Sequence, residues 1–152
     1  MKTCITILFI LFAGVANAQT FQRKAIVEIN SKFTIKLVKT ETGYDYTIIN
    51  KEPYNKTLNI SNIQSLFPKS RPDEIQGILT YTKFGDEMNT FLVLQSGLEN
   101  PLKYSLYVML NNNQEMENVP AINLFPDISS TEIYPLKLAY IAFSDFENVE
   151  EE

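Results

Sequence analysis

Apolar and polar residues alternate along most of this chain, whereas apolar residues at helical spacing are rare. The segment 102–110 shows the alternation most clearly, because every second position in it is apolar. These positions are Leu102, Tyr104, Leu106, Val108 and Leu110. A period of two places such residues on one face of a β-strand and the intervening residues on the other face. The segment is therefore predicted to be a half-buried strand.

Other short apolar segments predict further strands at residues 25–29, 33–37, 44–49, 77–83, 90–95, 119–125, 132–134 and 136–143. Turn-forming residues at 40–43 and 84–89 each close a predicted hairpin. A single helix is predicted at residues 61–67, with Ser61 as its cap and Pro68 at its end. This set of elements predicts an all-β protein: an antiparallel β-sandwich of the immunoglobulin-like kind, with about eight short strands. A small β-barrel is the alternative.

Prolines and lysines suggest where individual strands lie in the sheets. Proline lacks the backbone N–H, so the proline-interrupted segments 119–125 and 132–134 are expected at sheet edges. Lys32, Thr34 and Lys36 are expected to protect another edge against pairing. The segment 136–143 is apolar on both faces apart from Lys137, and it is expected at the centre of a sheet.

The N-terminal residues have the pattern of a secretory signal peptide. Lys2 precedes an apolar run, and the run ends in the small residues Ala16 and Ala18 before Gln19. The run is about 13 residues long, short of the roughly 20 that a membrane-spanning helix needs. Cleavage is therefore predicted after Ala18, which makes residues 1–18 the signal and residues 19–144 a single β-sandwich domain. No transmembrane segment is expected after processing, and the product is expected in the periplasm or outside the cell.

Composition narrows the chemistry. The chain has no histidine, and its single cysteine, Cys4, lies in the predicted signal. A Ser-His-Asp triad, a thiol protease and the usual zinc sites are thereby excluded from the processed chain. The remaining catalytic possibility is a carboxylate pair, for which the candidates are Asp73, Glu74, Asp86, Glu87 and Glu99. Two oxygen-rich loops, 85–89 and 111–115, lack the spacing of known calcium sites. We expect no enzyme activity, no cofactor and no metal.

Charge is distributed unevenly. Residues 19–71 hold nine basic and four acidic residues, and residues 72–152 hold three basic and fourteen acidic residues. The last eight residues contain five of these acids, so residues 145–152 are predicted to form an acidic, disordered tail. This uneven charge either keeps the protein soluble or forms a dipolar surface that attracts a charged partner. The acidic balance argues against nucleic acid as a partner. The Ala-x-Ala-Gln junction and the Lys-, Asn- and Ile-rich composition resemble those of exported proteins of Bacteroidota.

Tyrosines are the candidate ligand-binding residues. A tyrosine ring offers a flat apolar face together with a hydroxyl group. Tyr54, Tyr107 and Tyr134 are expected to be the most exposed, because they lie in a loop, on the polar face of a strand and beside a proline. The alternative is that they cover the rim of a sheet. The favoured hypothesis is an exported, non-catalytic binding module for an unidentified protein or glycan. A proteinaceous inhibitor or immunity-type partner of an envelope enzyme is the second hypothesis, and a carboxylate-pair enzyme is the third.

Overall fold

The computed structural model describes residues 24–110 and 115–150. The predicted signal peptide, with Ala16, Ala18 and Gln19 at its cleavage site, lies outside these residues. No helix in residues 24–110 and 115–150 is both long and apolar enough to cross a membrane. The described part of the chain is almost entirely β-structure, as the alternating pattern predicts.

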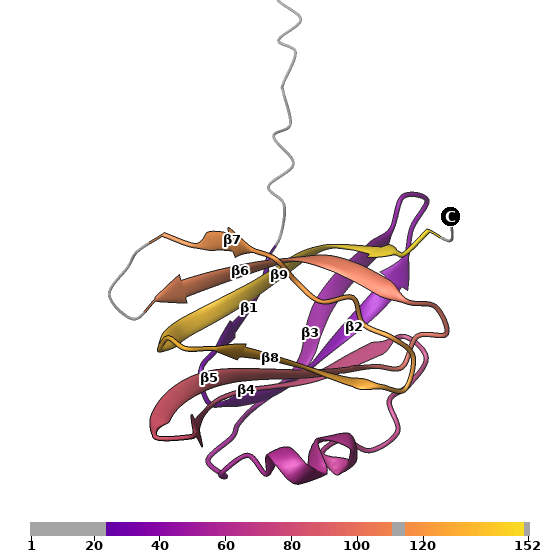
Figure 1. The fold of residues 1–152 in the computed structure, drawn as a ribbon. Coiled ribbons are helices and arrows are strands. Elements are labelled where there is room, and N and C mark those ends of the chain that lie inside the picture. The colour runs from indigo at the N-terminus through magenta and orange to yellow at the C-terminus, as the bar shows by residue number, and fades with distance from the viewer. Residues whose placement is uncertain (1–23, 111–114, 151–152) are drawn as a thin grey trace, which may run out of the picture.

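Two antiparallel sheets face each other across an apolar interior (Figure 1). One sheet has the strand order β1-β9-β6-β7 and the other the order β3-β2-β4-β5-β8. The strands are β1 (Ala25–Glu28), β2 (Ser31–Lys39), β3 (Tyr44–Pro53), β4 (Glu74–Phe84), β5 (Glu87–Ser96), β6 (Leu102–Leu110), β7 (Glu117–Val119), β8 (Ser129–Tyr134) and β9 (Leu138–Asn148). The described residues form no closed barrel, so the structure confirms the β-sandwich and excludes the alternative.

The inward-facing residues of both sheets form the main core. On β6 the alternate residues from Leu102 to Val108 are all buried, as their period of two predicts. Phe33 on β2 packs its ring against Phe143 on β9, with the ring centres 5.8 Å apart. Both rings are almost fully buried. Burial of apolar area on this scale is what holds the two sheets together, at about 25 cal/mol per Å² removed from water.

Strand β9 is central and longer than the predicted segment 136–143. Its pairing with β6 shifts register twice. As a result Leu138, Ile141, Phe143 and Phe146 are buried although their spacing is irregular. The predicted disordered tail at residues 145–152 is wrong for residues 145–148, which belong to β9. Phe146 stays in the strand because its ring packs against those of Phe143 and Tyr104.

The connection from β3 to β4 covers the outer face of the five-stranded sheet. Residues Leu58 and Phe67 of this connection bury a second apolar cluster against Ile78, Phe91 and Val93. The predicted helix at residues 61–67 is instead a short 3₁₀ helix, η1 (Ile60–Ser65). Its cap is Asn59, whose Oδ1 accepts a hydrogen bond from the N–H of Ser61 at 3.1 Å. The prediction that Ser61 caps the helix is therefore wrong, because the helix begins one residue earlier.

The sheet edges are partly as predicted. The short strands β7 and β8 lie at edges, as their neighbouring prolines indicate. Strand β7 covers only the first residue of the predicted segment 119–125, because Pro120 ends it. The predicted edge role of Lys32 and Lys36 is wrong: β2 lies between β3 and β4, so both of its backbone sides are paired.

Candidate functional site

Loops from distant parts of the sequence meet at one end of the sandwich. The β2–β3 loop lies close to the C-terminal end of β9 (Figure 1). Residues 97–100, after β5, lie against residues 70–73, before β4. A Cβ atom at Gly97 would be 2.0 Å from the carbonyl oxygen of Arg71, so only glycine permits this approach of two backbones. The Gly97 N–H donates to the carbonyl of Glu74 at 2.9 Å, which holds the two segments together.

These loops form an open cleft of about 280 Å³. Its lining combines two almost fully buried leucines with one aromatic ring and three charged side chains. They are Leu37, Leu98, Tyr44, Lys39, Asp73 and Glu99. An apolar floor with a few charged groups at the rim is the usual composition of a binding site, because the floor supplies affinity and the polar groups supply orientation.

A second groove, of about 440 Å³, adjoins the first and shares Lys39 and Tyr44 with it. Its other walls are the β2–β3 loop and the end of β9, including Glu41, Glu147 and Glu150. The Tyr44 hydroxyl donates to the Asn148 side-chain oxygen at 2.8 Å, which fixes the tyrosine ring between the two grooves. Tyr44 therefore forms part of a continuous surface that runs from one groove to the other.

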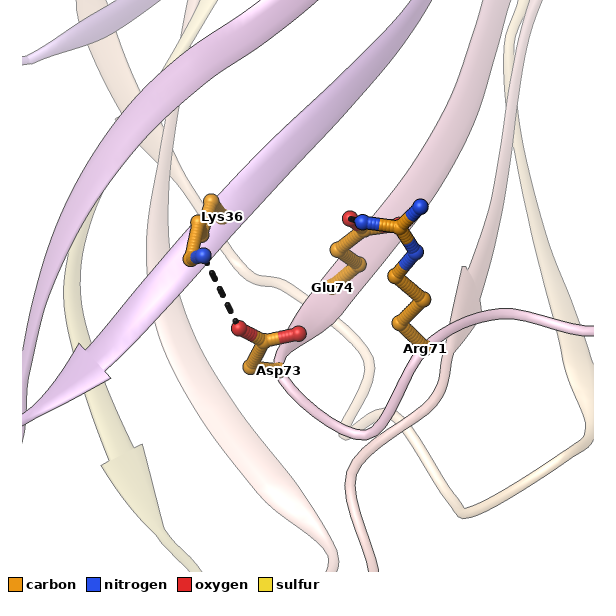
Figure 2. Close-up of polar contacts among 4 residues, drawn as sticks. All are labelled: Lys36, Arg71, Asp73 and Glu74. Atoms are coloured by element: carbon orange, nitrogen blue, oxygen red, sulfur yellow. Dashed lines mark ion pairs between the residues drawn. The ribbon is translucent and has the colours of Figure 1, made fainter.

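Ion pairs occupy some of the charges at this end of the molecule. The ammonium group of Lys36 lies 3.3 Å from Asp73, and a guanidinium nitrogen of Arg71 lies 3.8 Å from the buried Glu74 (Figure 2). Lys103 pairs in the same way with Glu147. Each of these pairs has at least one well-exposed side chain, so each contributes little to stability. Their main consequence is that they neutralise part of the rim.

The charges that stay unpaired around the two grooves are mostly negative. Among residues 24–110 and 115–150 no ion pair involves the side chains of Lys39, Glu41, Glu99 and Glu150. Three of these four are acidic and one is basic. The rim therefore favours a ligand that brings positive charge, with Lys39 as a local exception that favours one negative or hydrogen-bond-accepting group.

Asp73 and Glu99 are two of the acids that the sequence analysis identified as candidates for a carboxylate pair, and they line the same cleft. The structure gives them different surroundings, because Asp73 is paired with Lys36 whereas Glu99 is exposed to solvent. A glycosidase places its two carboxyl groups on either side of the glycosidic bond that it cleaves. The described residues contain no group of three or more acidic side chains that could hold a metal ion.

The three tyrosines predicted as ligand-binding residues lie on three different sides of the sandwich. Tyr107 is on the outer face of β6, and the ammonium group of Lys24 sits 3.4 Å from the centre of its ring. Tyr54 follows β3 and packs half-buried against the second apolar cluster. Burial raises the pKa of Tyr54. Tyr134 ends β8 and packs against the main core. The structure does not bring these rings together into one platform.

Tyr134 belongs to a hydrogen-bonded group between the two sheets. The buried carboxylate of Glu132 accepts bonds from the hydroxyl groups of Tyr134 and Tyr104, the latter at 2.9 Å. It also accepts one from the N–H of Ile122 at 3.3 Å. Burial, with the negative charge of Glu132 and the hydrogen bond to it, raises the pKa of both tyrosines. The hydroxyl of Tyr134 is therefore already used within the protein.

Sequence reasoning did not single out Lys39 and Tyr44 as site residues. Tyr44 is predicted to be the first residue of a strand, and the structure confirms this. A signal was present, since both residues flank the predicted turn at 40–43, and turns at the ends of a sandwich often carry binding residues. The partners across the cleft, Leu98 and Glu99, are more than 50 residues away in sequence. Only the folded chain shows that these segments meet.

The chain was compared with protein-family models, with curated proteins and with solved structures, and nothing matches it in any of the three comparisons. Its function therefore has to be inferred from its own residues.

Proposed function

We propose that this chain is an exported, non-catalytic binding module of the bacterial envelope, and that the two adjoining grooves at the loop end of the sandwich are its binding site. The observation that carries the proposal is the continuity of the grooves through Lys39 and Tyr44. A surface with a buried apolar floor, an aromatic ring at its centre and unpaired charges at its rim provides both affinity and orientation.

The ligand that fits this surface best is an extended, basic segment of a protein. Leu37 and Leu98 form the base of the first groove, and one side chain of such a segment would lie over them, between Pro72 and Tyr44. Glu99 and Glu41 offer unpaired carboxylates to lysine or arginine side chains on either side. Tyr44 lines both grooves, so a cationic side chain bound there would lie beside its ring. Lys39 lies between these acids and is available to a backbone carbonyl of the segment.

An inhibitor or immunity-type partner of an envelope enzyme is the second candidate function. The observation that favours it is the β2–β3 loop, which extends beyond the ends of the neighbouring strands in Figure 1 and carries Glu41. An inhibitor would insert this loop into a basic active site, whereas a binding module would receive a basic segment in its grooves. Both functions use the negative charge of this end of the molecule. In a binding module the grooves of this chain receive the partner, whereas in an inhibitor a cleft of the partner receives the β2–β3 loop.

The proposal is tested by binding of synthetic peptides to the purified protein, measured by isothermal titration calorimetry. One peptide alternates lysine with leucine and a second alternates glutamate with leucine. We expect the basic peptide to bind, and Glu99→Lys together with Glu41→Lys to abolish binding. Asp86→Lys together with Glu87→Lys is the matched control, because both residues are also exposed but lie at the far end of the strands, in the β4–β5 hairpin. Equal binding of both peptides, or equal loss in the control variant, would refute the proposal.

Capture from envelope fractions separates the two functions. The protein and its Glu41→Lys variant serve as baits, and enriched proteins are measured by quantitative mass spectrometry. Enrichment of an enzyme whose activity falls when the protein is added supports an inhibitor. Enrichment of a protein whose basic segment alone competes for binding supports the binding module.

A further inference from the structure

A further pocket, of about 270 Å³, lies at the end of the sandwich opposite the two grooves. Asn30 of this pocket stands just before β2, which Lys39 ends, and Tyr54 follows β3, which Tyr44 begins. In Figure 1 the connection after β3 lies below the sheets, away from the β2–β3 loop at the top. Strands of nine and ten residues separate the two ends by about 30 Å, at ~3.3 Å per residue. A ligand in this pocket would therefore leave both grooves free.

The lining of this pocket is polar and carries a single charge. Amide, hydroxyl and ammonium groups stand beside an aromatic ring, and they include those of Asn30, Asn55, Lys56, Thr57, Thr80 and Tyr54. No lining residue is acidic. Of the acids nearby in sequence, Glu28 is paired with Lys51 at 3.4 Å. Glu52 lies opposite Lys32 in the β2–β3 ladder. The pocket therefore favours a ligand with negative charge, in contrast to the mostly negative grooves at the other end.

Two anchors hold residues 55–57 at this pocket. On one side the N–H of Tyr54 donates to the carbonyl of Asn30 at 2.7 Å. On the other side Leu58 is buried in the second apolar cluster. Residues 55–57 are exposed, and within the described part of the chain no hydrogen bond or ion pair involves their side chains. The segment is therefore fixed at both ends while its amide, ammonium and hydroxyl groups stay available to a ligand.

Asn30 is held in a conformation that leaves its amide N–H groups available. Its backbone has a φ of 59°, a left-handed value that asparagine adopts more readily than most residues. The hydroxyl of the buried Thr80 donates to Oδ1 of Asn30 at 3.2 Å, which fixes the side chain. Among residues 24–110 and 115–150 no hydrogen bond uses Nδ2 of Asn30, so this atom keeps two donors for a ligand. Donors of this kind beside Lys56 suit carboxylate and hydroxyl oxygens.

Tyr54 adds a flat apolar surface to these polar groups. Its side chain is half-buried against the second apolar cluster and also lines the pocket. A sugar ring has apolar C–H faces and hydroxyl groups around its edge, so it matches an aromatic ring that stands beside hydrogen-bond donors. A simple inorganic anion would use the charge of Lys56 but not the ring. The combination therefore favours a sugar that carries a carboxylate.

We propose that this pocket binds one acidic sugar unit of a polysaccharide. The carboxylate of the sugar pairs with the ammonium group of Lys56. Its hydroxyl groups bond to the side chains of Asn30, Asn55 and Thr57, and its ring lies against Tyr54. The pocket is open to solvent, so the neighbouring units of the polysaccharide extend beyond it. The proposal is independent of peptide binding in the grooves, because the two sites share no residue.

Titration of the isotope-labelled protein with a galacturonic acid trimer, followed by the amide signals in nuclear magnetic resonance, tests the proposal. We expect shifts of the side-chain amides of Asn30 and Asn55 and no shift of the backbone amides of Lys39 and Tyr44. The methyl ester of the trimer has the same rings without the charge, and it is expected to bind at least about fivefold more weakly because the pair with Lys56 is lost. Equal binding of the ester, or acetate giving the same shifts with the same dissociation constant, overturns an acidic sugar as the ligand. Absence of shifts at Asn30 and Asn55 up to the solubility limit of the trimer overturns the site itself.

Substitutions at exposed positions test the roles of the individual residues. Lys56→Gln is expected to raise the dissociation constant of the trimer about tenfold. Lys69→Gln is the matched control, because Lys69 is an exposed lysine of the same β3–β4 connection that does not line the pocket. Asn30→Asp keeps the shape of the side chain and the tolerance of positive φ but replaces the N–H donors by a carboxylate, so it should also weaken binding about tenfold. Equal effects of the two lysine substitutions, or unchanged binding by the Asn30→Asp variant, overturn the proposal.

Discussion

Gly77 and Phe33 form a contact whose energy can be worked out from the structure. They are directly paired across β2 and β4, and the Phe33 ring lies over the glycine. A Cβ atom at Gly77 would be 2.2 Å from Cζ of Phe33. Carbon atoms rest at about 3.5 Å or more, so the Gly77→Ala variant has to displace the ring by roughly 1.3 Å. The ring has little room to move, because it is 1% exposed and packs against Phe143.

The expected cost follows from two opposing effects. Forcing an extra methyl group into a packed core costs about 1–3 kcal/mol. Replacing glycine by alanine in a strand returns about 0.5–1 kcal/mol, because the unfolded chain loses freedom. The Gly77→Ala variant should therefore be less stable by about 1–2 kcal/mol. In a Phe33→Leu background the ring is gone, so the same substitution should be neutral or stabilising by up to about 1 kcal/mol.

Equilibrium unfolding in urea, followed by far-ultraviolet circular dichroism, measures the four variants of this double-mutant cycle. The chain contains no tryptophan, so circular dichroism is the suitable signal. We expect a coupling energy between the two sites of about 2 kcal/mol. If the two substitutions are additive to within about 0.5 kcal/mol, the ring does not hold the position that the structure gives it, and the reasoning is refuted.

Three further predictions concern the loop end, the buried tyrosines and an unpaired hydroxyl. Gly97→Ala should lower the free energy of unfolding by at least about 1 kcal/mol, since the hydrogen bond from Gly97 to Glu74 would be strained or lost. The variant should also bind the basic peptide more weakly. Unchanged stability in urea would contradict the close contact between the two backbones. The raised pKa values of Tyr104 and Tyr134 contribute stability below pH 10, and this contribution should be lost as the pH rises further, by about 1.4 kcal/mol per pH unit for each tyrosine. Tyr104→Phe should reduce the loss of unfolding free energy per pH unit above pH 10. An unchanged pH dependence in alkaline unfolding curves would contradict the contribution of Tyr104. The Thr82 hydroxyl is buried with no hydrogen-bond partner among the described residues, so Thr82→Val should stabilise the protein by about 1 kcal/mol in the same urea assay; a loss of stability would reveal a partner for the hydroxyl.

The candidate site was only partly visible in the sequence. The acids Asp73 and Glu99 were identified by residue type, because few other groups in the chain could do chemistry. The cleft that they share was not predicted. It exists because β5 runs antiparallel to β4, so that Glu99 after the end of β5 lies near Asp73 before the start of β4. The exposure of Tyr134 was also misjudged. A residue beside a proline at a sheet edge is expected to be exposed, but Glu132 two residues earlier draws the hydroxyl into the space between the sheets.

The sequence by itself determined the fold class. A period of two along segments such as 102–110 gives a strand one apolar face that can be buried, whereas the same spacing gives a helix no apolar face. It also determined which short strands lie at edges, since proline removes a ladder bond wherever it stands. Only the tertiary structure decided the rest. Phe143 and Phe146 are three residues apart, which breaks the period of two, so the predicted strand ends at residue 143. In the structure a register shift between β9 and β6 lets both rings point into the core. Strand order, and with it the two grooves at the loop end, depends on contacts between distant segments, which no local pattern records.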